Sequence, residues 1–140
     1  MRDNLILRVI SRFLIPIIIL FALYVQFHGD YSPGGGFQAG VIFSSAILLY
    51  ALVFGLDSAA KVIPDSALIA CASLGVLLYA GTGVVSLFYG GEFLNYSLLA
   101  DNPTTGQHIG IIVIELGVGL TVAAVMLLIF FTFARRIIVK

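Results

Sequence analysis

The sequence predicts an all-α integral membrane protein with four transmembrane helices and with both the N- and the C-terminus in the cytoplasm. Of its 140 residues, 61% are hydrophobic and only 10% are charged, whereas a soluble globular domain carries about 25% charged residues. The apolar residues gather in four long runs, and all the lysines and arginines fall on one side of the implied membrane. These three observations predict the fold class.

The four apolar segments cover residues of about 9–27, 37–56, 67–89 and 109–133. Each is long enough to cross a hydrocarbon core about 30 Å thick at a rise of about 1.5 Å per residue. A spanning backbone must satisfy its own hydrogen bonds, which favours helices. Gly, Pro, Asp and Asn gather in the connections 28–36, 57–66 and 90–108. We therefore expect one membrane domain over residues 1–140, with no room for a soluble catalytic domain.

The distribution of positive charge predicts the orientation, because lysine and arginine concentrate in cytoplasmic segments. With four spans, the N-terminal part, the second connection and the C-terminal tail share one side. The 7 basic residues all lie there: Arg2, Arg8, Arg12, Lys61, Arg135, Arg136 and Lys140. We therefore expect 57–66 to be the inner loop, and 28–36 and 90–108 to be the outer loops.

Glu115 is an acidic residue deep in an apolar segment, about seven residues and roughly 10 Å from the predicted outer end of the fourth helix. A lone carboxylate in lipid is costly, so we expect it to face protein or water. It could relay protons or cations, or it could anchor a neighbouring helix or subunit. His108 lies close to two turns earlier on the same helix face. Because histidine changes charge near neutral pH, it could pass protons towards Glu115 through a bridging group.

The opposite face of the fourth helix carries small residues, which let helix backbones approach closely in membranes. The helix-packing candidates are Gly110, Gly117, Thr121 and Ala124. With an ionisable stripe on one face and a small-residue stripe on the other, we expect this helix to be packed on both faces. We also expect at least one of these faces to lie against another subunit.

The most unusual stretch runs from His28 to Gly40 and reads His-Gly-Asp-Tyr-Ser-Pro-Gly-Gly-Gly-Phe-Gln-Ala-Gly. Three consecutive glycines permit positive φ and close backbone approach. Just before a helix start, their N–H groups could form an anion-receptive or carbonyl-lined concavity. The stretch fits neither the P-loop nor the dinucleotide pattern, since no lysine follows the glycines. The residues alone leave open whether it is such a concavity or only a tight outer turn.

Several kinds of chemistry have no candidate residues in this sequence. It contains no Cys/His cluster, no nucleophile–base pair and no paired carboxylates, so we expect no metal, no other cofactor and no freestanding enzyme. The formal net charge of +0 gives no electrostatic footprint for nucleic acid. The single cysteine, Cys71, lies in an apolar run and is expected to be a packing residue.

The run from His28 to Gly40 closely resembles the signature of the MnhB family, whose members are small subunits of the Mrp-type multisubunit cation/proton antiporters. The resemblance covers the whole chain: its length, its four spans, its long third connection and its Gly-rich fourth helix bearing Glu115. It implies a small hydrophobic subunit of a complex in a prokaryotic cell membrane, where several membrane subunits exchange Na⁺ (K⁺ or Li⁺ in some members) for protons. The implied partners are the other membrane subunits, the transported Na⁺ and H⁺, and the lipid bilayer.

The resemblance also implies a role beyond a simple turn for the outer loop motif. The motif residues that could shape an outer cavity or a docking surface are His28, Pro33, Gly34, Gly35, Gly36 and Phe37. We expect the subunit to be needed for assembly, and it could line the ion path through Glu115 and His108. Two alternatives stay open: the equivalent subunit of a membrane-bound hydrogenase-type redox-driven ion pump, and a self-sufficient small four-helix exporter.

Overall fold

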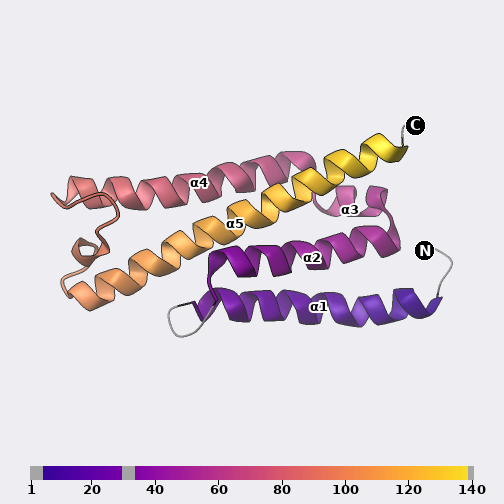
Figure 1. The fold of residues 1–140 in the computed structure, drawn as a ribbon, viewed down its shortest axis with the longest axis horizontal. Helices are drawn as coiled ribbons and strands as arrows, with labels where there is room; N and C mark the ends of the chain where they lie inside the picture. The colour runs from indigo at the N-terminus through magenta and orange to yellow at the C-terminus, as the bar shows by residue number, and fades with distance from the viewer. Residues whose placement is uncertain (1–4, 30–33, 139–140) are drawn as a thin grey trace.

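A computed structural model describes residues 5–29 and 34–138, and its regular structure is helical throughout these residues (Figure 1). The elements are α1 (Leu5–Phe27), α2 (Gly36–Phe54), α3 (Leu56–Val62), α4 (Asp65–Phe88), the short 3₁₀ helix η1 (Tyr96–Leu98) and α5 (Pro103–Ile138). Four of them, α1, α2, α4 and α5, are long and apolar enough to cross a membrane. The predicted all-α fold with four spanning helices is therefore confirmed.

The four long helices lie in the order α1, α2, α5, α4, so that the last helix in the sequence sits between the second and the fourth (Figure 1). The α1–α2 and α4–α5 connections both lie on the side away from the termini, which we call the loop end. The α4–α5 connection extends farther from the termini than the α1–α2 connection (Figure 1). The first and last described residues lie at the opposite end, which we call the termini end. Helix α5 thus packs against α2 on one side and against α4 on the other.

Glycines allow α5 to approach its two neighbours closely. A Cβ built on Gly40 of α2 would lie 2.6 Å from the carbonyl oxygen of Gly119 on α5. A Cβ on Gly75 of α4 would lie 2.5 Å from the carbonyl oxygen of Gly117, and one on Gly117 would lie 2.8 Å from that of Gly75. Small residues at such crossings let backbones pack directly, which is how helices associate in membranes.

A cluster of buried apolar residues lies towards the termini end, where α2, α3, α4 and α5 meet. Its members are Ala51, Ala59, Leu68, Ala124, Leu127 and Phe131. Beside it, the Arg135 guanidinium of α5 binds the Asp65 carboxylate of α4, with Arg135 Nη2 donating to Asp65 Oδ1 at 2.9 Å. The cluster and the ion pair tie the last turns of α5 to the first turn of α4.

The predicted inner loop 57–66 differs from the structure, because α3 occupies most of it. Gly55, with a φ of 104°, interrupts the helix after Phe54, and the chain restarts as a helix at Leu56. Asp57 lies in the first turn of α3 and Lys61 in the last, which suits the helix dipole. Ala59, 1% exposed, packs into the buried cluster and gives this short helix its tertiary support.

The fourth spanning helix also begins earlier than the predicted residue 109, at Pro103. The side chain of Asn102 accepts a hydrogen bond from the Thr104 N–H at 3.0 Å, and proline suits the first position of a helix. The predicted outer loop 90–108 is therefore shorter. Likewise, the first helix begins at Leu5 rather than at residue 9, and the fourth continues beyond residue 133.

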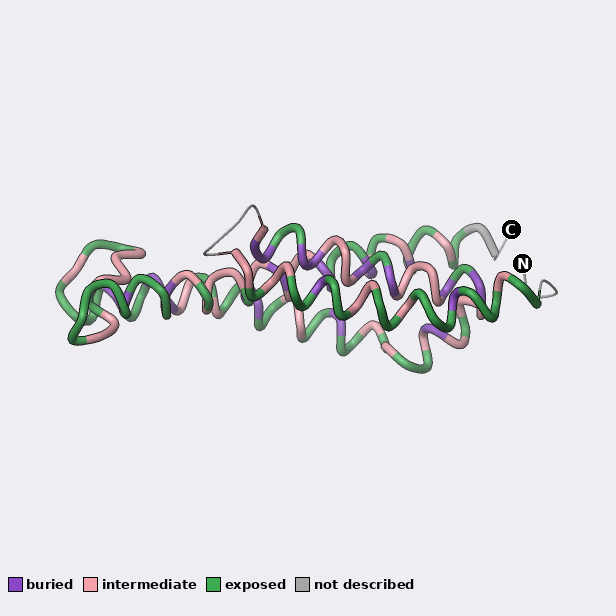
Figure 2. The backbone as a smooth tube through the Cα atoms, turned by 90° about the horizontal axis from the view of Figure 1, so that it is seen from below, coloured by how far each residue is buried: buried purple, intermediate pink, exposed green. Residues whose placement is uncertain are grey.

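Much of the apolar surface of this chain is not covered by the chain itself. Only 11% of the most apolar stretch of α1 is buried inside the chain. Figure 2 shows long exposed stretches on the helices. The fully buried apolar positions are mostly alanines. Such a surface is stable only in lipid or against other membrane subunits, which agrees with a multi-pass membrane protein.

Candidate functional site

The carboxylate of Glu115 lies against the glycine loop between α1 and α2. A Cβ built on Gly29 would overlap both carboxylate oxygens, and a Cβ built on Gly35 would lie 2.8 Å from Oε1. Only glycine leaves room at these two positions for the carboxylate to sit against the loop backbone. The structure therefore brings together two features that the sequence marked separately, the membrane carboxylate and the Gly-rich outer motif.

Gly36 completes this contact through the backbone of α5. A Cβ built on Gly36 would overlap the carbonyl oxygen of Glu115 and would lie 3.0 Å from its Cα. Any larger residue at Gly36 would therefore push α2 away from α5. We call Gly29, Gly35 and Gly36 the glycine cradle.

The cradle places the carboxylate at the N-terminal end of α2. Gly35 is the N-cap residue of α2, with a φ of 104° and no side-chain cap hydrogen bond. The first N–H groups of a helix lack partners within the helix and carry a partial positive charge. A carboxylate is the kind of group that such a helix end stabilises, so the helix dipole offsets part of the cost of holding Glu115 in an apolar segment.

The described residues at both ends of the α1–α2 loop contact the last turn of α1. The carbonyl oxygen of Val25 accepts hydrogen bonds from the N–H groups of His28 and Gly35, both at 3.4 Å. The imidazole of His28 stacks on the ring of Tyr24, with centroids 4.2 Å apart. Gly34 also fits closely, since a Cβ there would lie 3.2 Å from the Val25 carbonyl oxygen. These contacts fix both ends of the loop relative to α1.

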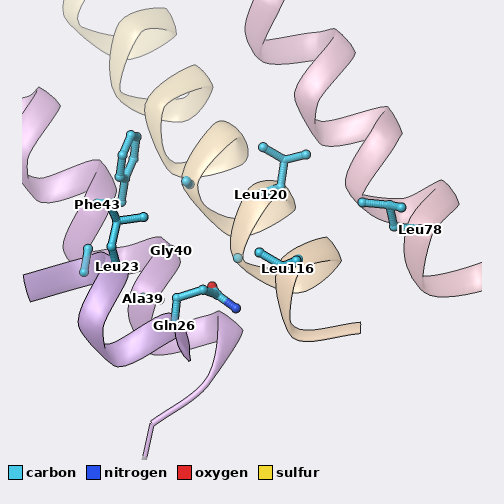
Figure 3. Close-up of a pocket in the computed structure, with 11 residues that line it drawn as sticks. Leu23, Gln26, Ala39, Gly40, Phe43, Leu78, Leu116 and Leu120 are labelled. Carbon is cyan, nitrogen blue, oxygen red and sulfur yellow. The ribbon is translucent and has the colours of Figure 1, made fainter. Parts of the chain in front are cut away.

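Towards the middle of the bundle, Gln26 is the polar side chain that lies between the glycine cradle and an apolar groove. Its Oε1 lies where a side chain on Gly119 would otherwise be, 2.5 Å from a built Cβ. Figure 3 shows the Gln26 amide directed from α1 towards α5, beside a groove of about 380 Å³. The other side chains that line this groove are apolar: Ala22, Leu23, Ala39, Phe43, Leu78, Leu116, Leu120 and Ala123. The groove therefore offers no continuation of the polar site.

His108 lies on α5, exposed, about 10 Å along the helix axis from Glu115. Because α5 begins at Pro103, His108 belongs to the helix itself and not to its edge, and Glu115 lies deeper in α5 than the predicted 10 Å. His108 is outside the glycine cradle. At this separation a proton could pass between these two residues only through a bridging group or water.

The remaining motif residues fall in different places. Phe37 follows the cradle and is 64% exposed, so its ring is open to lipid or to another subunit. Pro33 lies outside the described residues. Of the predicted motif, the glycines and His28 are therefore the residues placed at the loop end beside Glu115 or against α1.

The small-residue face of α5 packs within the chain. A Cβ on Gly110 would lie 2.5 Å from the Cβ of Tyr96, Gly117 contacts α4, and Ala124 is in the buried cluster. Thr121 Oγ1 donates to the Gly117 carbonyl at 2.9 Å and lies 3.5 Å from the Ala72 carbonyl of α4. At these positions the small-residue face of α5 is occupied by α4 and η1 of the same chain, whereas His108 on the ionisable face is exposed. That one of the two faces lies against another subunit stays a prediction.

Two residues of the site were not among the predicted ones. Gln26 could have been noticed, because it is a polar residue near the end of the first apolar segment, whose other polar residues lie near its beginning. Gly29 follows the histidine of the motif, but nothing in the sequence indicates that it contacts Glu115. Among the described residues no group of three or more His, Cys, Asp or Glu side chains could hold a metal ion. Glu115 is the carboxylate that the described residues bring to this site, and a single carboxylate can bind a proton or a monovalent cation.

Comparison with known proteins gives a consistent result. A family model described as a domain related to the MnhB subunit of Na⁺/H⁺ antiporters matches residues 6–128. Curated relatives named "Putative antiporter subunit mnhB2", from Staphylococcus aureus strains Newman and JH1, are 34% identical over 130 residues. The matched region covers 90% of this chain and 92% of each relative.

Proposed function

The chain belongs to the MnhB family of Na⁺/H⁺ antiporter subunits, and we propose that its Glu115, held in the glycine cradle, binds or relays a proton or Na⁺ for the antiporter. The protein is a small hydrophobic subunit of a multisubunit antiporter in a prokaryotic cell membrane. The proposal concerns what this subunit contributes to the exchange.

The contact between the Glu115 carboxylate and the loop glycines carries this proposal. Carboxylates within membrane segments are costly and typically mark ion or proton pathways. Interrupted backbone that meets the end of a helix is also a common place for small ions in membrane transporters, because free carbonyls and N–H groups are available there. In this chain, the carboxylate and the backbone of an irregular loop meet at one point, with Gln26 close by.

The proposed site needs partner subunits to become a path. Beyond Gln26, the groove along α5 is lined by apolar side chains, which do not conduct a desolvated cation. Ions would therefore enter and leave the site through groups of other subunits or through water at the loop end. This favours an accessory role in a complex over a self-sufficient exporter, and the antiporter relatives favour it over the hydrogenase-linked subunit.

The orientation that we propose follows from charge. The first and last described residues share one end of the bundle (Figure 1), and Arg8, Arg12, Lys61 and Arg135 belong to segments at that end. Because positive residues concentrate on the cytoplasmic side, the termini end faces the cytoplasm. The glycine cradle and Glu115 then lie towards the external side.

A purely structural role for Glu115 would use the same contact. A carboxylate at the N-terminal end of α2 could simply anchor the α1–α2 loop to α5. The two roles differ in what they require, because an anchor needs a hydrogen-bonding group of the right shape, whereas a proton or cation site needs a group that ionises.

The test replaces Glu115 by glutamine, which keeps the shape and much of the hydrogen bonding but cannot ionise. The full complex carrying Glu115→Gln is expressed in cells that lack their own Na⁺/H⁺ antiporters, and Na⁺-induced dissipation of ΔpH is measured in everted vesicles. Glu92→Gln is the matched control, since Glu92 is exposed in the α4–α5 connection. Normal assembly with lost exchange supports the proposal, and normal assembly with normal exchange leaves only the anchor.

A further inference from the structure

Two arginines near the termini end surround a single aromatic ring. The Cζ of Arg8 lies 5.6 Å and the Cζ of Arg12 lies 5.7 Å from the centroid of the Phe54 ring. Arg8 and Arg12 are one turn apart on α1, and Phe54 is the last residue of α2. Cations at this distance from a ring face are attracted by its quadrupole, so the ring holds both guanidinium groups at one place.

A pocket of about 280 Å³ lies at this place, lined by Arg12, Ile15, Tyr50 and Phe54. The rings of Tyr50 and Phe54 pack together with centroids 5.0 Å apart and form one wall. The pocket therefore has apolar walls formed by Ile15, Tyr50 and Phe54 and a positively charged group, Arg12, beside them.

The two positive charges are not neutralised by a described carboxylate. Asp65 is bound by Arg135, and Asp57 is close enough to Arg135 to act on it electrostatically. Within residues 5–29 and 34–138, neither Arg8 nor Arg12 forms a salt bridge. Two like charges held at one ring, with no carboxylate of the described residues bound to them, create a local positive potential that an anion would relieve.

We propose that this pocket binds the head group of an anionic phospholipid, with Arg8 and Arg12 on the phosphate and with Tyr50, Phe54 and Ile15 against the glycerol and upper acyl chain. The pocket lies near the start of α1 and the end of α2, and the ends of spanning helices are where lipid head groups meet the hydrocarbon core. Basic pockets between transmembrane helices are typical of anionic-lipid binding, and guanidinium groups suit phosphate geometry. A free phosphate ion would use the arginines but not the apolar walls.

The proposal does not depend on the transport role of Glu115, which lies at the other end of α2. Its consequence is that an anionic lipid fixes α1 to α2 at the termini end, where α1 is otherwise little buried. The bound lipid would thus stabilise the packing of α1 against the rest of the subunit.

The test uses the purified, delipidated complex that contains the full chain. It is titrated with phosphatidylglycerol, phosphatidylcholine or inorganic phosphate, and bound molecules are counted by native mass spectrometry. We expect the complex with Arg8→Gln and Arg12→Gln to lose one tight phosphatidylglycerol site, with an affinity reduced about tenfold or more. The matched control, Lys61→Gln with Arg136→Gln, removes two charges from the same end and should change this site less than about threefold.

A third variant keeps the test informative if the double arginine variant does not assemble. Phe54→Leu retains both charges but removes the ring that gathers them, and it should weaken the same lipid site several-fold. Three results would overturn the proposal: unchanged phosphatidylglycerol binding in the arginine and Phe54 variants, equal binding of phosphatidylcholine, or inorganic phosphate binding as tightly as the lipid. An equal loss in the Lys61/Arg136 control would show general charge attraction and would overturn it too.

Discussion

The carboxylate of Glu115 on α5 lies against Gly29, the second residue after α1, so closely that a Cβ on Gly29 would overlap both carboxylate oxygens. This relationship ties the irregular loop between α1 and α2 to the ionisable residue of α5. It also allows the position of the carboxylate and the packing of α2 against α5 to be changed separately. At Gly29 a side chain would meet the far end of a flexible side chain, whereas at Gly36 it would meet the α5 backbone.

Replacing Gly29 by alanine should therefore displace the Glu115 carboxylate with little effect on helix packing. If the carboxylate handles the transported ion, exchange by the Gly29→Ala complex should fall several-fold while assembly stays normal. Gly81→Ala is the control, because a Cβ on Gly81 meets nothing within 4 Å. Unchanged exchange in Gly29→Ala would show that the position of the carboxylate does not matter.

Replacing Gly36 by alanine should act on stability instead. The new Cβ would overlap the Glu115 carbonyl oxygen and come within 3.0 Å of the Glu115 Cα, so α2 and α5 must separate. Overpacking of this kind costs about 1–3 kcal/mol. Thermal unfolding of the complex in detergent should show a lower midpoint and a lower yield for Gly36→Ala than for Gly81→Ala. Equal midpoints would contradict the close α2–α5 approach.

Loss of the Asp65–Arg135 ion pair should have a small effect. Both side chains are more than one third exposed, at 42% and 43%, and exposed pairs contribute about 0–1 kcal/mol. Asp65→Asn should lower the unfolding midpoint slightly at low salt and not at high salt, because salt screens exposed charges. A large, salt-independent loss would mean that this end of α4 and α5 is covered in the complex.

The proposed orientation can be measured by cysteine labelling. After Cys71→Ala has removed the native cysteine, Lys61→Cys and Glu92→Cys place single thiols on the two opposite sides of the bundle, both at exposed positions. In intact cells, a membrane-impermeant maleimide should label the thiol at position 92 and not the thiol at position 61. The reverse pattern would place the termini outside and the glycine cradle in the cytoplasm.

The sequence was sufficient for the fold class because membrane spans are long, apolar and few in number. It also marked Glu115 and the glycine motif, each for its own physical reason. Their contact could not be predicted, since it depends on how far α2 slides along α5, and many registers would bury similar small residues. That register is set by the fit of Gly36 and Gly40 against Glu115 and Gly119.

One boundary error, at the start of α5, had a signal that could have been used. Asn102 followed by Pro103 is an N-cap followed by a favoured first helical residue, and the structure starts α5 there. The short helix α3 was harder to predict, because its formation depends on burial of Ala59 against α2, α4 and α5, which is a tertiary effect. The neighbours of α5 within the chain could not be predicted for the same reason, since the sequence does not indicate that α2 and α4 lie on its two sides.

The most direct measurement of the central claim is the Na⁺ dependence of exchange by the complex carrying Glu115→Gln. Everted vesicles would be energised, ΔpH dissipation recorded over a range of Na⁺ concentrations, and assembly checked by blotting of the membrane complex. If Glu115 handles the ion, exchange should fall about tenfold or more, or its apparent Na⁺ affinity should drop, at normal assembly. Exchange and Na⁺ affinity equal to those of the unmodified complex would contradict the claim and leave Glu115 as an anchor of the α1–α2 loop.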